Sequence, residues 1–101
     1  MAKRTDANQK EIVRTLRQCG ASVQILSDVG NGCPDLVVGA HGKNYLIEVK
    51  DGSKPPSGQK LTDHEQVFHE TWKGQVCIIK SIEEAIAFIK KQNSVFHEEI
   101  R

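Results

Sequence analysis

The apolar residues of this chain recur at two spacings that predict alternating helices and strands. Steps of three and four residues, typical of a helix with one buried face, occur near both ends and within the stretch 62–74. Short apolar runs bounded by glycine-bearing loops predict strands between these helices. The expected elements, in chain order, are a helix over 6–19, strands over 22–27, 35–39 and 44–50, a helix over 62–73, a strand over 75–80 and a helix from 81 onward. This αβββαβα order describes a small mixed central sheet flanked by helices.

Local sequence signals place the ends of several elements. Each predicted helix opens on a capping-box pattern, in which a short polar side chain precedes Glu or Gln by three residues. The three pairs are Asp6 with Gln9, Thr62 with Glu65, and Ser81 with Glu84. The pair His41-Gly42 predicts a hairpin turn between the second and third strands.

The second predicted helix carries the chain's single tryptophan and is expected to bury it. One stripe along this helix gathers the positions that would face the core, namely Val67, Phe68, Thr71 and Trp72. Trp72 is therefore assigned to the core rather than to a platform that stacks bases. His64 and His69 lie five residues apart and would diverge by about 140° on a helix, so they are expected to be surface or partly packed residues with no shared metal face.

Length and composition favour a single folded domain. The 101 residues, 38% hydrophobic and 27% charged, suffice for one core and do not resemble a disordered chain. We expect that domain to span 1–101, with its core at about 5–91, a mobile loop at 51–60 and a tail at 92–101. A chain this small leaves much of its apolar surface uncovered, which favours a homodimer.

Neither a membrane location nor a disulfide framework is expected. No apolar run approaches the roughly 18 residues of a membrane span and the polar start lacks a signal-peptide pattern, so we expect a cytoplasmic protein. The three cysteines, Cys19, Cys33 and Cys77, are odd in number and lack CxxC spacing, so we expect them to be reduced and packed. A net charge of +1 does not by itself mark a nucleic-acid binder. Positive residues nevertheless outnumber acids over 1–20, where they form either a phosphate-binding surface or an ordinary solvated face.

The third predicted strand places two charges on one face of an otherwise apolar run. Side chains alternate along a strand, so Glu48 and Lys50 share one face. Asp35 opens the preceding strand, and a hairpin would bring its carboxylate toward Glu48. Two such carboxylates are typical of a Mg²⁺ site, which the backbone carbonyl of Val49, water and a substrate phosphate would complete. Lys50 would then lie beside the metal, where it orients or helps to deprotonate a water and offsets charge on phosphate.

A plainer interpretation of the same residues is that Asp35 is an ordinary turn residue after proline. Glu48 and Lys50 would then form a solvated strand face. The loop 51–60, with two lysines, is likewise either a tether or a DNA contact.

Several motifs stand in a fixed order along the chain. They are Gly32-x-Pro34-Asp35, then Glu48-x-Lys50, then Gln66 in the following helix. Together with Glu11 in the first helix, this arrangement resembles the PD-(D/E)xK nuclease superfamily, and most of all its virus-type replication-repair nuclease (VRR-NUC) branch, over roughly residues 5–80. Cys33 fills the variable place of the first motif.

The resemblance implies a restriction-endonuclease-like core in which Asp35 and Glu48 bind Mg²⁺ or Mn²⁺ and Lys50 is catalytic. It also implies that Glu11 supports the metal, directly or through another ligand, and that Gln66 positions Lys50, water or phosphate. From the residues alone, Glu11 is equally well interpreted as a charge flanking an amphipathic helix, and Gln66 as an exposed helical glutamine.

For function, the resemblance implies an endonuclease that cuts DNA phosphodiester bonds and prefers branched, flapped or junction structures. A two-fold dimer would present two active sites to two strands, which suits the resolution of a Holliday junction in DNA repair. The short format suits a phage protein acting in the host cytoplasm. The residues assigned to DNA contact are Lys10, Arg14, Lys54 and Lys60. Two alternatives remain, a non-catalytic DNA-binding module with the same fold and a sequence-specific restriction-type nuclease, for which the chain is short of a recognition element.

Overall fold

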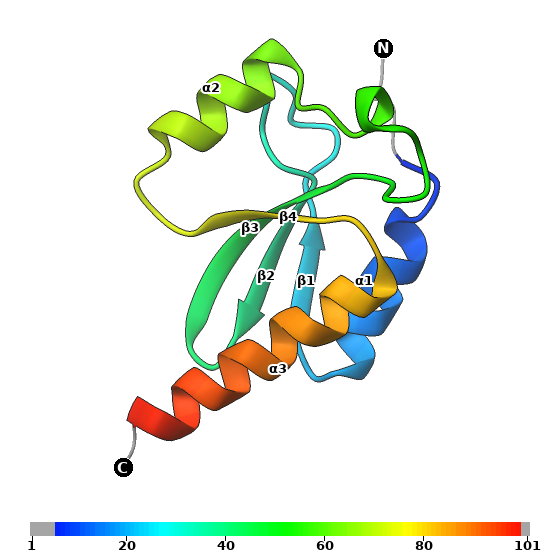
Figure 1. Ribbon diagram of the computed structural model, residues 1–101. Coiled ribbons are helices and arrows are strands. Elements are labelled where there is room, and N and C mark those ends of the chain that lie inside the picture. Colours follow the sequence, from blue (N-terminus) through cyan, green and yellow to red (C-terminus); the bar gives the residue numbers. More distant parts are fainter. Residues whose placement is uncertain (1–5, 100–101) are drawn as a thin grey trace.

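The computed structural model describes the backbone of residues 6–99 and the side chains of residues 6–92. Its elements are α1 (Gln9–Gln18), β1 (Ser22–Ile25), β2 (Leu36–Ala40), β3 (Lys43–Val49), a 3₁₀ turn (Pro56–Gly58), α2 (Asp63–Thr71), β4 (Val76–Ile79) and α3 (Ile82–Glu99) (Figure 1). Apart from the 3₁₀ turn, this is the αβββαβα order that the sequence predicts, in a small mixed α/β domain. The helix α3 continues into the stretch 92–101 that was expected to be a tail and ends at Glu99, because no glycine or proline interrupts 82–99.

The four strands form one sheet in the order β1-β2-β3-β4. The first three strands pair antiparallel, whereas β4 pairs parallel to β3 after the chain returns through α2. The hairpin between β2 and β3 turns at His41 and Gly42, as expected, and their φ values of 53° and 77° suit a two-residue turn of type I′. It pairs Leu36 with Ile47 and so determines which residues of the two strands lie opposite each other.

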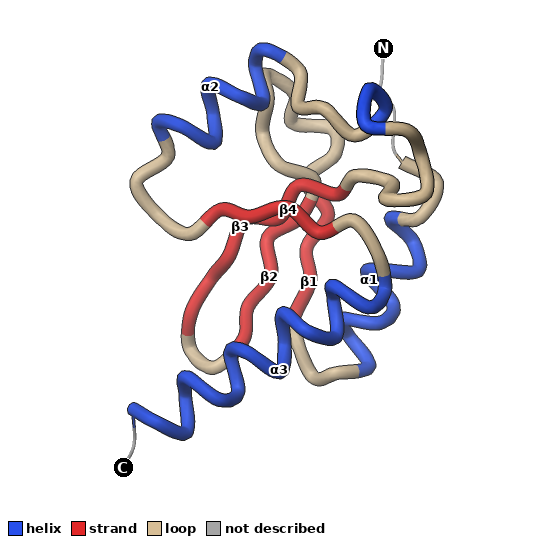
Figure 2. The backbone as a smooth tube through the Cα atoms, in the orientation of Figure 1, coloured by secondary structure: helices blue, strands red, loops and turns tan. Residues whose placement is uncertain are grey.

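The core lies between one face of the sheet and the helices α1 and α3. Figure 2 shows these two helices together on one side of the strands, and α2 apart from them near the end of β3. The apolar side chains that fill the core are Ile12, Val13, Leu16, Ala21, Leu36, Val38, Tyr45, Ile47, Val49, Ile79, Ala85 and Ile89. Because side chains alternate along β3, Glu48 and Lys50 point away from this core and toward α2.

The buried stripe predicted for α2 is wrong. Val67 is 57% exposed and Trp72 is 48% exposed, and the buried side chain of this helix is Glu65. The physical reason is the placement of α2, which contributes no side chain to the apolar core and instead contacts Lys50, just after β3, through Glu65. Trp72 stacks on Phe68 instead, with ring centroids 4.9 Å apart and planes inclined by 14°.

The start of α1 also differs from the prediction. Its N-cap is Asn8, and the capping box expected between Asp6 and Gln9 does not form, because Asp6 accepts a hydrogen bond from the Gln9 backbone amide through its own backbone carbonyl. By contrast, the box of Thr62 with Glu65 is confirmed in both directions.

The remaining expectations have mixed outcomes. Ser81 caps α3 through a bond from the Glu84 amide, as expected. The three cysteines form no disulfide, but Cys19 is exposed at the end of α1 rather than packed. Within the described part of the chain, no helix combines the length and the apolar character that a membrane crossing needs.

Candidate metal centre and active site

Two buried carboxylates lie opposite each other at one end of the β2–β3 hairpin. Asp35 immediately precedes β2, and continuing the register from the Leu36–Ile47 pair places it opposite Glu48. Directly opposed side chains on one sheet face have Cβ atoms about 5 Å apart. Asp35 is 4% exposed and Glu48 is 1% exposed. The fold therefore brings the two predicted metal-binding carboxylates into neighbouring, buried positions.

Asp35 is fixed from both sides. Its Oδ2 accepts a hydrogen bond from the Val49 amide at 2.8 Å, and its backbone carbonyl accepts one from the Leu26 amide at 2.7 Å. The amide and carbonyl of one strand residue point to the same edge of the strand. The Val49 carbonyl therefore points to the edge of β3 beside which Asp35 lies. This direction suits the metal-ligand role predicted for the carbonyl.

The loop before Asp35 packs directly on the first turn of α2. Gly32 has a φ of +79°, which favours glycine, and a Cβ at this position would overlap the His64 carbonyl and lie 2.9 Å from the Glu65 nitrogen. Gly32 thus allows the backbone of the Asp35 loop to lie against the backbone of α2. This contact connects the element that carries Asp35 to the element that carries Glu65.

Lys50 lies between two glutamates. Its Nζ donates to Glu65 Oε1 at 2.9 Å and lies 4.0 Å from Glu48 Oε2. The same Glu65 oxygen accepts a hydrogen bond from the Thr62 amide at 2.9 Å, so the helix cap and the ion pair share one carboxylate. A buried ammonium needs such partners because transferring its charge from water into the protein costs on the order of several kcal/mol.

The helical residue beside Lys50 is therefore Glu65 and not the predicted Gln66. Gln66 is exposed and donates to Glu70 along the outer side of α2, at 2.8 Å. Successive helical residues point about 100° apart, so a shift of one position changes which residue faces the sheet. The sequence signal that could have found Glu65 is its place in the capping box, which ties its carboxylate to the helix start nearest the sheet.

Glu11 is not brought to the carboxylate pair. It is exposed on α1, and α1 packs on the core face of the sheet, opposite the face of Glu48 and Lys50. The buried polar residue of α1 is Gln9, 5% exposed, which donates to Ser27 Oγ at 3.1 Å. Its Oε1 is buried and has no hydrogen-bond partner among the described residues. The burial of Gln9 was not predicted, although its position continues the buried stripe of Ile12, Val13 and Leu16 by one helical turn.

The start of α1 is nevertheless tied to the end of β3. The Asn8 side-chain amide donates to the backbone carbonyls of Lys50 and Lys80, both at 3.1 Å. Asn8 thus holds α1 against the ends of β3 and β4, one residue beyond each strand.

His69 lies one helical turn beyond Glu65 on α2. Burial lowers the pKa of His69 most, the Lys50 charge lowers it further, and the Glu65 charge opposes both. Its Nε2 is enclosed and has no hydrogen-bond partner among the described residues. The histidine is partly packed, as expected, but its electrostatic link to the lysine was not predicted. The signal available in the sequence was that His69 follows Glu65 by four residues, which makes the two side chains neighbours on a helix.

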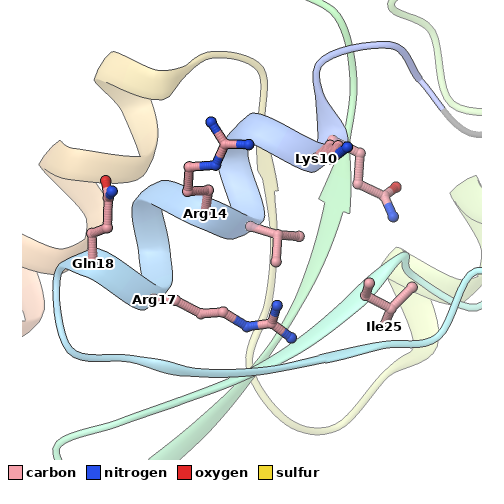
Figure 3. Close-up of a pocket in the computed structure, with 7 residues that line it drawn as sticks. Lys10, Arg14, Arg17, Gln18 and Ile25 are labelled. Atoms are coloured by element: carbon pink, nitrogen blue, oxygen red, sulfur yellow. The ribbon is translucent and has the colours of Figure 1, made fainter.

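The predicted DNA-contact residues lie in two places. Lys10 and Arg14 are exposed on α1, beside a groove that Figure 3 shows in close-up. Lys54 pairs with Asp6 at 3.3 Å, and Lys60 is exposed. The loop 51–60 that carries these two lysines contains the 3₁₀ turn, and its mobility stays a prediction.

The donor atoms at this site suit a hard divalent cation. Within the described residues, no group of three or more His, Cys, Asp or Glu side chains could hold a metal, so the carboxylate ligands would be Asp35 and Glu48 alone. Mg²⁺ is commonly bound by one or two carboxylates, with water and substrate phosphate as the other ligands. When ionised, Asp35, Glu48, Glu65 and Lys50 together carry a formal charge of −2, which a divalent cation would balance.

Fold and site together define a small mixed α/β domain with two carboxylates and a lysine buried at one end of its sheet. Comparison with protein-family models, curated proteins and solved structures finds no match to this chain. Its function is therefore inferred from its own residues and their geometry.

Proposed function

We propose that this chain is an endonuclease that hydrolyses DNA phosphodiester bonds with Mg²⁺ or Mn²⁺ held by Asp35 and Glu48. The observation that carries the proposal is the burial of these two carboxylates opposite each other, with the Lys50 ammonium 4.0 Å from Glu48. When bound, the cation supplies Lewis-acid activation of a phosphoryl oxygen and lowers the pKa of a water. The protein contributes two fixed oxygen donors and one fixed positive charge.

Lys50 is the residue that acts on the substrate. Its ammonium donates a hydrogen bond to the attacking water or to a non-bridging phosphate oxygen, and its charge offsets the negative charge that develops on phosphate. Glu65 acts through Lys50 and is a positioning residue, because its bond at 2.9 Å determines where the ammonium lies. In this proposal Glu65 takes the role that the family resemblance implied for Gln66.

The proposal includes a PD-(D/E)xK core of the VRR-NUC type. A hairpin that carries the aspartate before one strand and the Glu-x-Lys pair in the next, flanked by helices, supports it. Branched or junction DNA as substrate and a two-fold homodimer are parts of the same proposal. A dimer would set two such sites against two strands of one junction.

The test is a cleavage assay on end-labelled four-way, flapped and linear duplex DNA, with and without Mg²⁺. We expect Mg²⁺-dependent cutting of the branched substrates, loss of cutting in Lys50→Ala, and full activity in the exposed control Lys73→Ala. Binding without cutting would instead favour a non-catalytic DNA-binding module. Cutting of linear DNA at one sequence would favour a restriction-type nuclease.

Metal binding separates the two kinds of site residue. Lys50→Ala should retain most of its Mn²⁺ affinity, whereas Asp35→Ala should lose both Mn²⁺ binding and cleavage, because only the aspartate donates a ligand. A Lys50→Ala protein that cuts at the parental rate would remove the role given to the lysine.

A further inference from the structure

A groove with a volume of about 560 Å³ lies between α1 and the edge strand β1, and neither Asp35 nor Glu48 lines it. Its charged lining comes entirely from α1, as Lys10, Arg14 and Arg17, while Ile25 comes from β1 (Figure 3). Val13 and the 48%-exposed Ile25 make its floor apolar. Among the described residues that line it, none is acidic.

The three cations form one row. Positions 10, 14 and 17 of a helix fall within an arc of about 60°, and they span about 10 Å along the helix axis. All three are exposed. Arg17 is also anchored, because its Nη2 donates to the Val23 carbonyl of β1 at 3.0 Å. The row spans about three phosphate steps of one DNA strand, which advances about 3.4 Å per phosphate along its axis.

The groove begins at the end of the sheet where the proposed active site lies. Gln9 lines it and donates to Ser27, which follows β1 at the end nearest Asp35. The preceding residue, Asn8, donates to the Lys50 carbonyl. The start of the groove therefore lies at the same end of the sheet as the active site, although α1 covers the opposite face.

We propose that this groove binds the phosphodiester backbone of a DNA arm outside the catalytic centre, an inference that rests on the proposed nuclease function. Lys10, Arg14 and Arg17 contact phosphates along one strand, and the apolar floor packs against deoxyribose. Such contacts are insensitive to sequence, because they read only the backbone. Through these contacts the enzyme would bind one arm of a branched substrate outside the active site.

The experiment is equilibrium binding of a dye-labelled duplex by fluorescence anisotropy, with a chelator present and over a range of KCl concentrations. The groove variant is Lys10→Gln with Arg14→Gln, and the matched control is Lys73→Gln with Lys90→Gln, which removes the same charge from exposed positions elsewhere. Thermal melting of each variant confirms that it folds. A second titration uses polyglutamate in place of DNA.

We expect the groove variant to bind DNA roughly tenfold or more weakly at low salt. The magnitude of the negative slope of log K against log salt should decrease by about 1.8, since each of the two lost phosphate contacts contributes about 0.9, while the control keeps the parental slope. Equal slopes in the two variants would overturn the proposal. Polyglutamate bound as tightly as DNA, with the same dependence on the groove, would also overturn it in favour of an acidic protein partner.

The chelator makes this result independent of catalysis. A protein that binds DNA through the groove but never cuts it would leave this inference standing and remove the proposed nuclease function. A protein that cuts DNA while the groove and control variants bind alike would do the reverse.

Discussion

Replacing Gly32 with alanine tests whether the loop before Asp35 and the start of α2 form one packed unit. A Cβ at this position would overlap the His64 carbonyl and approach the Glu65 nitrogen to 2.9 Å. Gly30 offers a matched control, because its φ of +78° is nearly the same as the +79° of Gly32, yet a Cβ there meets nothing within 4 Å. Both changes carry the same backbone strain, and only one adds a clash with α2.

The expected magnitudes follow from these two contributions. A left-handed conformation costs a residue with a Cβ about 1–2 kcal/mol, which is the whole cost expected for Gly30→Ala. Gly32→Ala adds an overpacking cost of about 1–3 kcal/mol, because both neighbours are backbone atoms that cannot rotate away. A difference of about 1 kcal/mol corresponds to about 4–8 °C in Tm for a domain of this size.

The assay compares Tm and DNA cleavage for the two variants and the parent. Gly32→Ala should melt at least about 4 °C below Gly30→Ala. It should also lose more cleavage at a temperature where both are folded, because relief of the clash displaces the turn that holds Glu65 against Lys50. Variants that melt together and cut equally well would refute the idea that this glycine couples the two elements.

Three further predictions concern single side chains. Glu65→Ala should lower the free energy of unfolding by about 3 kcal/mol, because it leaves a buried lysine with a weaker partner, while Gln66→Ala should change it by no more than about 0.5 kcal/mol in the same denaturant titration. The pKa of His69 is lowered from 6.5 in the folded protein, so the unfolded chain takes up a proton first as the pH drops. The free energy of unfolding should therefore decrease below pH 6.5, and His69→Gln should flatten that decrease. An unchanged pH profile would count against burial as the cause of the lowered pKa. Burial raises the pKa of Cys77 to about 11, so a thiol reagent at pH 8 should label the exposed Cys19 first in the folded protein, and comparable rates of labelling would contradict the structure.

Much of the backbone could be predicted because short-range rules determined it. The alternation along β3 sent Glu48 and Lys50 to one face, and the turn at His41-Gly42 brought Asp35 to its place opposite Glu48. These outcomes depend on strand periodicity and turn chemistry, which a sequence expresses directly.

Helix orientation could not be predicted in the same way. Periodicity assigns an apolar stripe to the core, but α2 lies outside the core and meets the Lys50 ammonium, so Trp72 is half exposed and Glu65 is buried. On α1 the buried polar residue is Gln9, whereas the family resemblance implied a role for Glu11, two positions further along the helix. Deciding between neighbouring helical residues requires the position of the partner strand, which is a tertiary property.

The claim on which all the chemistry depends is that Asp35 and Glu48 hold one divalent cation beside Lys50. Paramagnetic broadening of backbone amide signals by substoichiometric Mn²⁺ measures this directly. We predict selective broadening at Asp35, Glu48 and Val49, its loss in Asp35→Asn, and its persistence in Asp51→Asn. Broadening confined to other parts of the chain, or equal in the two variants, would contradict the claim.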